Sequence, residues 1–87
     1  MKSIQITVEN QVGLHARPAT LFVQTAQKHQ AEITVSYEGK TVNAKSLLGL
    51  LSLGVTKDAT ITVAANGSDE EVALNALTSL LEINFGE

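Results

Sequence analysis

The chain has 87 residues, of which 44% are hydrophobic, and a formal net charge of −3. These values predict one folded domain spanning residues 1–87 and exclude a disordered chain. They also argue against nucleic acid as a partner, because six Lys and Arg residues spread along the chain form no basic stripe and only 3% of residues are aromatic.

The N-terminal part of the sequence predicts a strand followed by a helix. Alternating apolar residues predict a half-buried strand over about residues 2–9. A helix is expected to begin just after His15 and to run to about Lys28, with Pro18 in its first turn, where a missing N–H costs nothing. One face of this helix carries apolar residues at the i, i+3, i+4, i+7 spacing, namely Ala19, Phe22, Val23 and Ala26.

The middle of the chain predicts a hairpin and a short helix. Alternation over residues 32–43, interrupted by the two-residue turn Glu38-Gly39, is typical of a β-hairpin. Ser46 stands where an N-cap belongs, ahead of a leucine-rich helix. We expect this helix to end near Gly54, because glycine suits the left-handed conformation of a helix cap.

The C-terminal part predicts a fourth strand and a third helix. The strand covers residues 60–65, which are rich in β-branched side chains, and it is followed by an Asn-Gly turn. Residues 68–71 predict a capping box in which Ser68 pairs with Glu71 and acidic residues lie in the first turn. The last helix is expected to reach about Ile83. Its apolar face comprises Ala73, Leu77, Leu80 and Leu81.

The resulting order of elements is β-α-β-β-α-β-α. It predicts an α+β fold with two layers, in which a four-stranded antiparallel sheet carries three helices on one face. A parallel arrangement is disfavoured, because the two strands of the hairpin must run antiparallel.

Residue types also bear on where the protein works. The sequence contains no cysteine, which excludes disulfides and thiolate metal sites. Its first residues alternate like a strand and lack the apolar run of a signal peptide. No segment approaches the ~20 apolar residues needed to cross a bilayer. We therefore expect a cytoplasmic protein in a reducing compartment, with no membrane partner.

His15 is the candidate functional side chain, because it directly precedes the predicted helix start and has Arg17 two residues away. A helix N-terminus offers unpaired N–H donors and a partial positive charge, which suit a phosphate. The same features favour the neutral, nucleophilic imidazole near neutral pH. If His15 carried a phosphoryl group, the backbone N–H groups of Ala16 and Arg17 and the guanidinium of Arg17 would donate hydrogen bonds to it.

Three other interpretations of His15 are a surface loop residue, a metal ligand and a member of a hydrolase triad. The only other histidine is His29, and one helix joining the two would separate them by roughly 20 Å, too far to share an ion. No Gly-x-Ser-x-Gly elbow is present. His29 itself suits a structural role near a helix C-terminus. The phosphoryl-acceptor interpretation explains the neighbours of His15 as well as the histidine.

Two segments carry a resemblance to a known family. Residues 13–19 read GLHARPA and resemble the active-site segment of the HPr family, the histidine-containing phosphocarriers of the bacterial phosphotransferase system. Residues 42–54 read VNAKSLLGLLSLG and are similar to the regulatory-serine region of the same family. The resemblance covers residues 2–83. It implies an open-faced sandwich and a stoichiometric carrier rather than an enzyme, with no metal or nucleotide cofactor.

The resemblance also implies partners. Enzyme I, phosphorylated from phosphoenolpyruvate, would donate a phosphoryl group to His15, expected at Nδ1, and a sugar-specific IIA domain would receive it. In Gram-positive relatives an ATP-dependent HPr kinase/phosphorylase modifies the serine matching Ser46, which creates a co-repressor for a catabolite-control transcription regulator. Gln24, Gln27 and Gly49 stand where enteric relatives add lysines, and this favours the Gram-positive type.

The leucine-rich helix has more leucine than one buried face needs. The resemblance implies that Leu47, Leu48 and Leu51, together with Thr20, dock partners, whereas Leu50 and Leu53 turn inward. Ser46 has a plain structural interpretation as an N-cap, and both roles can hold together. Nothing in the sequence demands more than a monomer.

Two alternatives remain open at this point. One is a regulatory HPr-like interaction protein that acts through Ser46 and the leucines; known members of that kind lack the active-site histidine, which this chain keeps. The other is a phosphocarrier of a paralogous, nitrogen-related phosphorelay, which only the identity of the reacting donor would distinguish. An unrelated domain that binds small molecules explains neither motif.

Overall fold

The computed structural model describes residues 1–8, 16–55 and 59–84, and within them the side chains of residues 1–8, 19–55 and 59–80. The elements follow the predicted order, and their bounds are β1 Lys2–Thr7, α1 Ala16–Gln27, β2 Glu32–Tyr37, β3 Lys40–Asn43, α2 Leu47–Ser52, β4 Thr60–Asn66 and α3 Glu70–Asn84. Among the helices described, none is long and apolar enough to span a membrane.

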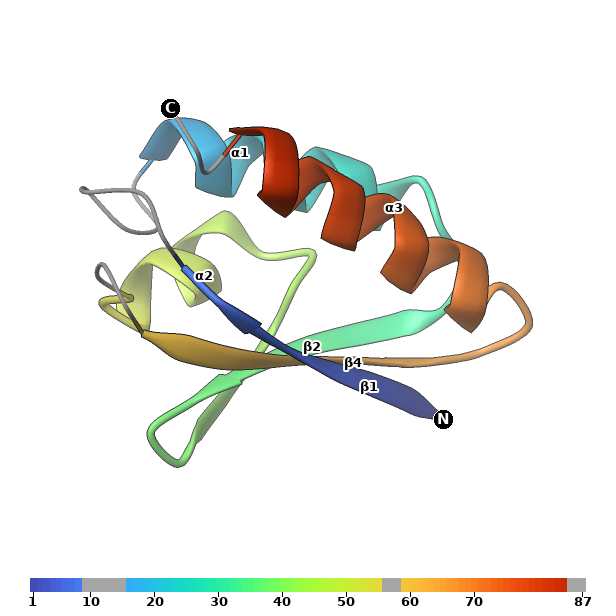
Figure 1. The fold of residues 1–87 in the computed structure, drawn as a ribbon, viewed down its shortest axis with the longest axis horizontal. Coiled ribbons are helices and arrows are strands. Elements are labelled where there is room, and N and C mark those ends of the chain that lie inside the picture. Colours follow the sequence, from blue (N-terminus) through green and yellow to red (C-terminus); the bar gives the residue numbers. More distant parts are fainter. Residues whose placement is uncertain (9–15, 56–58, 85–87) are drawn as a thin grey trace.

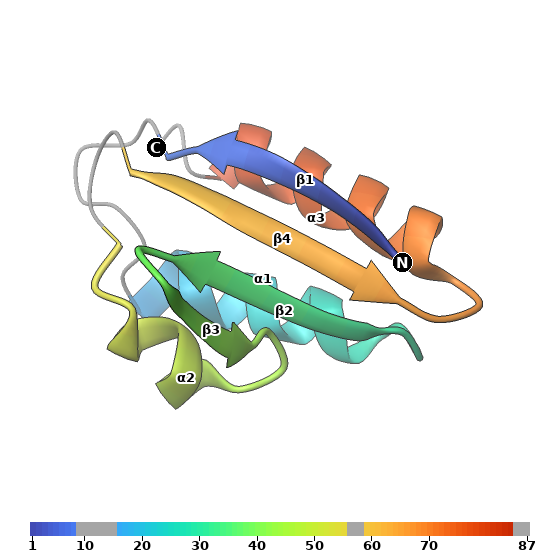
Figure 2. The ribbon, with the colours of Figure 1, turned by 90° about the horizontal axis from the view of Figure 1, so that it is seen from below.

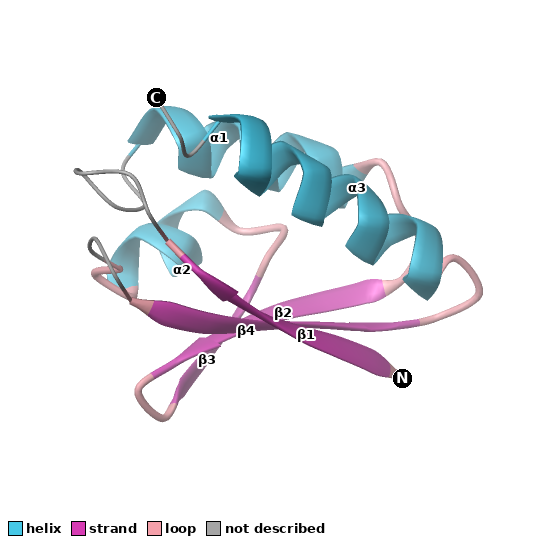
Figure 3. Cartoon of the chain, viewed as in Figure 1, coloured by secondary structure: helices cyan, strands magenta, loops and turns pink. Residues whose placement is uncertain are grey.

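The four strands form one sheet in the order β1-β4-β2-β3, and every neighbouring pair is antiparallel. The helices lie on one side of this sheet (Figures 1 and 3). Seen from the other side, α1 lies behind β2, α3 lies behind β1, and α2 lies beside the edge strand β3 (Figure 2). The predicted α+β class, with one open sheet face, is confirmed.

The β2–β3 hairpin turns at the two residues that the sequence indicates. Glu38 has a φ of 48° and Gly39 a φ of 84°. A two-residue hairpin turn of this kind needs positive φ at both central positions, and its twist matches that of the flanking strands. It sets the register Tyr37↔Lys40, which continues to Thr34↔Asn43.

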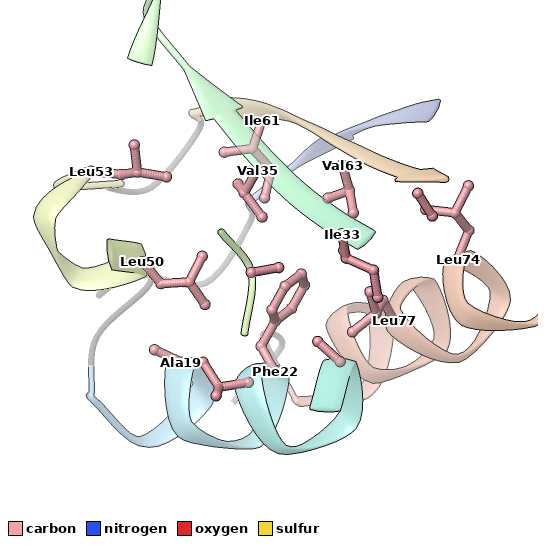
Figure 4. Close-up of a cluster of buried hydrophobic side chains, with 14 of the residues drawn as sticks. Ala19, Phe22, Ile33, Val35, Leu50, Leu53, Ile61, Val63, Leu74 and Leu77 are labelled. Carbon is pink, nitrogen blue, oxygen red and sulfur yellow. The ribbon is translucent and has the colours of Figure 1, made fainter. Parts of the chain in front are cut away.

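The core lies between the sheet and the helices. Alternate residues of β2 and β4 point into it, so that Ile33, Val35, Ile61 and Val63 are each at most 1% exposed. Figure 4 shows side chains from all three helices meeting these strands, including Phe22 of α1, Leu50 of α2 and Leu77 of α3. The predicted apolar face of α1 is confirmed, because its four residues are buried: Ala19, Phe22, Val23 and Ala26.

The outer face of the sheet carries hydroxyl side chains. Thr7 and Thr60 are paired across β1 and β4, with 3.1 Å between their Oγ1 atoms. Near the opposite edge of the same face, Ser36 Oγ of β2 lies 2.9 Å from Thr41 Oγ1 of β3. Such cross-strand pairs stabilise a solvated sheet face through side-chain hydrogen bonds.

Two predicted details of the elements need correction. The first strand ends at Thr7 rather than near residue 9, although the Val8 N–H still donates to Ala59 O at 2.8 Å. The capping box of Ser68 with Glu71 is wrong. The Glu71 carboxylate faces Lys2 Nζ at 3.3 Å, and it is Glu70 that reaches back, accepting the N–H of Gly67 at 3.2 Å.

The capping arrangement is therefore shifted by one residue, to positions 67–70. Since Gly67 has no side chain, only the glutamate half of a box can form there. The hydrogen bond from Gly67 lowers the pKa of the Glu70 carboxyl, with a contribution from the N-terminal amine of Met1 at 3.3 Å. The predicted acidic first turn of α3 is confirmed by Glu70 and Glu71.

Candidate functional site

His15 lies outside the described residues, and so do the side chains of Ala16 and Arg17. The backbone that follows His15 is described, and α1 begins at Ala16, directly after the histidine in the sequence. The first turn of α1 contains no acidic residue, so none of its own carboxylates offsets the positive end of the helix. The predicted roles of His15, Ala16 and Arg17 stay predictions.

The first half of α1 is anchored by the core. Ala19 is fully buried, and it faces the same part of the core as Leu50 of α2 (Figure 4). Thr20, the next residue, is half-buried. The backbone that follows the candidate histidine is therefore held by packing against α2 and the sheet.

Ser46 caps α2 as predicted. Its backbone is extended, with φ −113° and ψ 115°, and its Oγ accepts the N–H of Gly49 at 3.1 Å. Gly49 is suited to this position, because an added Cβ would lie only 3.3 Å from Ser46 Oγ. The helix ends as expected before Gly54, whose φ is 65°.

Lys45 connects the start of α2 with the end of α1, a role that the sequence did not indicate. Its Nζ donates to the backbone oxygen of His29 at 2.8 Å, and its own backbone oxygen accepts from Gln27 Nε2 at 3.2 Å. Its N–H donates to Asn43 Oδ1 at 2.8 Å. The helix α1 spans about 16 Å from Ala16 to Gln27. These bonds therefore place the start of α2 near the C-terminal end of α1 rather than near Ala16, the residue that follows His15 in the sequence.

Leu50 of α2 and Leu53, which follows the helix, turn inward as predicted. Leu50 is fully buried and Leu53 is 7% exposed, whereas Leu48 is 81% exposed. Leu47 and Leu51 are half-buried and pack partly against the core. We call Leu47, Leu48 and Leu51 the leucine patch; its exposure is centred on one residue, and its predicted role in docking is not tested by the fold.

His29 has the structural environment expected for it. Its Nδ1 lies 3.0 Å from the backbone oxygen of Thr25 in the preceding turn of α1, and its ring is half-buried. In the parts of the chain that the structure describes, no group of three or more His, Asp or Glu side chains is placed to hold a metal ion.

Asp69 makes the second long-range contact that the sequence did not indicate. Its carboxylate accepts the N–H groups of Gln30 at 2.9 Å and Ala31 at 2.8 Å. These hydrogen bonds, chiefly the one from Gln30, lower the pKa of the Asp69 carboxyl. The residue directly before a helix is expected to cap its own helix, so no local pattern pointed to partners 38 and 39 residues away.

The comparisons with known proteins cover nearly the whole chain and agree with one another. Residues 2–82 match the family model described as the PTS HPr component phosphorylation site. A crystal structure of HPr from Thermoanaerobacter tengcongensis is 50% identical, covers 100% of this chain and 98% of its own, and superposes with a TM-score of 0.94. HPr from Bacillus anthracis is 44% identical over 91% of this chain and 94% of its own, with a TM-score of 0.86.

A third relative is named for a different role. Crh, a catabolite repression protein of Bacillus subtilis, is 40% identical over 94% of each chain, with a TM-score of 0.75, and is described as a dimer with a swapped domain. Both kinds of relative share the open-faced sandwich and the sequence match extends over nearly every element. The chain belongs to the HPr family of phosphocarrier proteins of the phosphotransferase system.

Proposed function

We propose that this chain accepts a phosphoryl group on His15 from phosphorylated enzyme I and passes it to a histidine of a sugar-specific IIA domain. The observation that carries the proposal is the position of His15 in the sequence, immediately before the 12-residue helix α1, in a chain that matches the HPr family over residues 2–82. The first-turn N–H groups and the positive end of α1, with Arg17, would stabilise the phosphorylated ring.

The modest strength of a helix end suits a carrier. A charge near a helix terminus is stabilised by about 0.3–1 kcal/mol when it is exposed. An acceptor site of this kind holds the phosphoryl group without trapping it, so the group can pass to the next histidine. Positioning and electrostatic stabilisation would be shared with the partner protein.

Incubation with enzyme I and phosphoenolpyruvate tests this proposal. We expect one acid-labile phosphoryl adduct per chain by intact mass spectrometry, absent in His15→Ala and retained in His29→Gln. His29 is the matched control, because it is the only other histidine and its ring is engaged by Thr25. An enzyme I preparation that phosphorylates another HPr but leaves this chain unmodified would overturn the proposal.

We also propose that Ser46 is a regulatory phosphorylation site for an HPr kinase/phosphorylase, and that the modified chain binds a catabolite-control transcription regulator. Ser46 is half-buried at the first turn of α2, where added negative charge is electrostatically tolerated. The similarity to Crh supports this second function. With ATP and kinase, Ser46→Ala should lose the acid-stable adduct and Ser52→Ala should keep it.

The partners and the assembly belong to the same proposal. We infer that enzyme I and IIA domains dock on the leucine patch and Thr20, and that the chain works as a cytoplasmic monomer. Native mass spectrometry at micromolar concentration should show the monomer, and a stable dimer would instead resemble the assembly described for Crh. Reacting the chain with each enzyme I homologue of its host separates sugar transport from a nitrogen-related phosphorelay.

A further inference from the structure

One peptide group lies between two opposite charges. The carbonyl oxygen of His29 accepts from the Lys45 ammonium at 2.8 Å, and the N–H of Gln30, on the other side of the same peptide bond, donates to Asp69 Oδ2 at 2.9 Å. The peptide dipole is thus aligned with a cation at its negative end and an anion at its positive end. Hydrogen bonds with an ionised partner are stronger than neutral ones. Each of the two bonds also polarises the shared peptide group in the direction that strengthens the other bond.

The two charges come from separate parts of the chain. Lys45 lies in the loop between β3 and α2, and Asp69 lies between β4 and α3, whereas the peptide group follows the C-terminal end of α1. The two contacts therefore join the ends of three helices. The Lys45 bond and the neighbouring bond from Ala31 to Asp69 are part-buried, so salt screens them less than exposed ion pairs, whereas the bond from Gln30 to Asp69 is exposed.

We propose that Lys45 and Asp69 act as one electrostatic clamp on the His29–Gln30 peptide group, and that this clamp positions α2 against α1. Gln27 strengthens the arrangement, because its side chain holds the backbone oxygen of Lys45 at 3.2 Å. Lys45 directly precedes Ser46, so the clamp fixes the residue from which α2 starts. It sets where Ser46 and the leucine patch lie relative to the first turn of α1.

A double-mutant cycle tests the clamp itself. Lys45→Met keeps most of the side chain's length and removes the ammonium, and Asp69→Asn keeps the shape and removes the carboxylate charge. We expect each single change to lower the equilibrium constant for folding, measured by urea unfolding. The fold-loss of the double variant should be smaller than the product of the two single fold-losses by a factor of more than about two. Additivity within about twofold would overturn the clamp.

Lys28→Met provides the matched control. Lys28 is exposed and lies beside His29 in the sequence, so it carries the same charge near the same peptide group. The structure describes no side-chain hydrogen bond for its ammonium. Its cycle with Asp69→Asn should be additive, and coupling as large as that of Lys45 would show a general charge effect rather than a clamp.

The positioning role needs a functional measurement, and this part rests on the proposed phosphoryl transfer to His15. At a temperature where every variant is folded, both Lys45→Met and Asp69→Asn should raise the KM for phosphorylation by enzyme I by at least about twofold, with kcat unchanged. Lys45→Arg, which keeps a cationic donor, should restore the KM. A lysine that contacts the partner directly would also raise the KM when removed, but loss of the opposite charge at Asp69 would then lower the KM or leave it unchanged.

The outcomes separate the two proposals. A wild-type chain that accepts no phosphoryl group contradicts the proposed function and leaves the unfolding cycle as the test of the clamp. A wild-type chain that is phosphorylated, with both variants at the wild-type KM, contradicts the positioning role alone. The positioning role stands when Lys45→Met and Asp69→Asn, which remove opposite charges, both raise the KM.

Discussion

The carboxylate of Asp69 accepts the backbone N–H of Ala31 at 2.8 Å, although the two residues are 38 positions apart in the sequence. The same two loops also meet at Gly67, where an added Cβ would lie 2.7 Å from the Cα of Ala31. A charge-assisted hydrogen bond and a close backbone approach thus join the start of α3 to the segment that follows α1.

Gly67→Ala should destabilise the protein through this approach. The new Cβ meets backbone atoms that cannot rotate away, so we expect a loss near the upper end for overpacking, about 3 kcal/mol in urea unfolding. Gly54→Ala is the control, because its φ is 65° and nothing lies within 4 Å of the added Cβ. That variant should lose about 1 kcal/mol from backbone conformation alone. Equal losses would contradict the clash.

Asp69 should make stability depend on pH in the acid range. Its folded pKa is lowered from the usual 3.8, so its stabilisation is fully present above that unfolded value and is lost as the pH falls through the folded pKa. Asp69→Asn should therefore be less stable than wild type at pH 7, and the gap should close as the pH falls below about 3.8. Urea unfolding across this range measures the gap. A gap that stays constant with pH would exclude the carboxylate as its source.

Ser46→Ala should remove the N-cap of α2. The N–H of Gly49 then loses its acceptor, and we expect a loss of about 1 kcal/mol by thermal or urea unfolding. Ser52 lies at the other end of the same helix, where its exposed hydroxyl donates to Gly49 O at 2.6 Å. Ser52→Ala should change stability by less than about 0.5 kcal/mol. The capping role fails if the two variants have the same stability.

Leu50→Ala and Leu48→Ala should separate folding from docking within one helix. Leu50 is fully buried, so its truncation should cost about 2–5 kcal/mol of stability. Leu48 is 81% exposed, and its truncation should leave stability within about 0.5 kcal/mol while weakening enzyme I binding in a titration. Unchanged binding by Leu48→Ala would remove this residue from the proposed docking surface.

Local patterns in the sequence were sufficient for several features whose cause is local. The spacing of Ala19, Phe22 and Val23 predicted the buried face of α1, since helical periodicity alone selects it. Ser46 was predicted as an N-cap because its partner is three residues away. The turn at Glu38-Gly39 was predicted because glycine permits the positive φ of its second central position.

The missed features depend on contacts between distant parts of the chain. Ser68 and Glu71 have the spacing of a capping box, but Glu71 lies beside Lys2, which is 69 residues away. The partners of Lys45 and Asp69 likewise become neighbours only once the helices pack on the sheet. The predictions for His15 and Arg17 are of a third kind, because they concern chemistry and are decided by phosphorylation of the chain rather than by the fold.

The outer face of the sheet, which carries the hydroxyl pairs, has a practical consequence. Ser46, the leucine patch and the first turn of α1 all belong to the helical layer, whereas Gln5 sits in the middle of β1 and is exposed. Since the sequence has no native cysteine, a single thiol introduced at Gln5 would accept a fluorescent dye at one defined location. Binding of successive partners could then be followed optically from the face opposite the proposed docking surface.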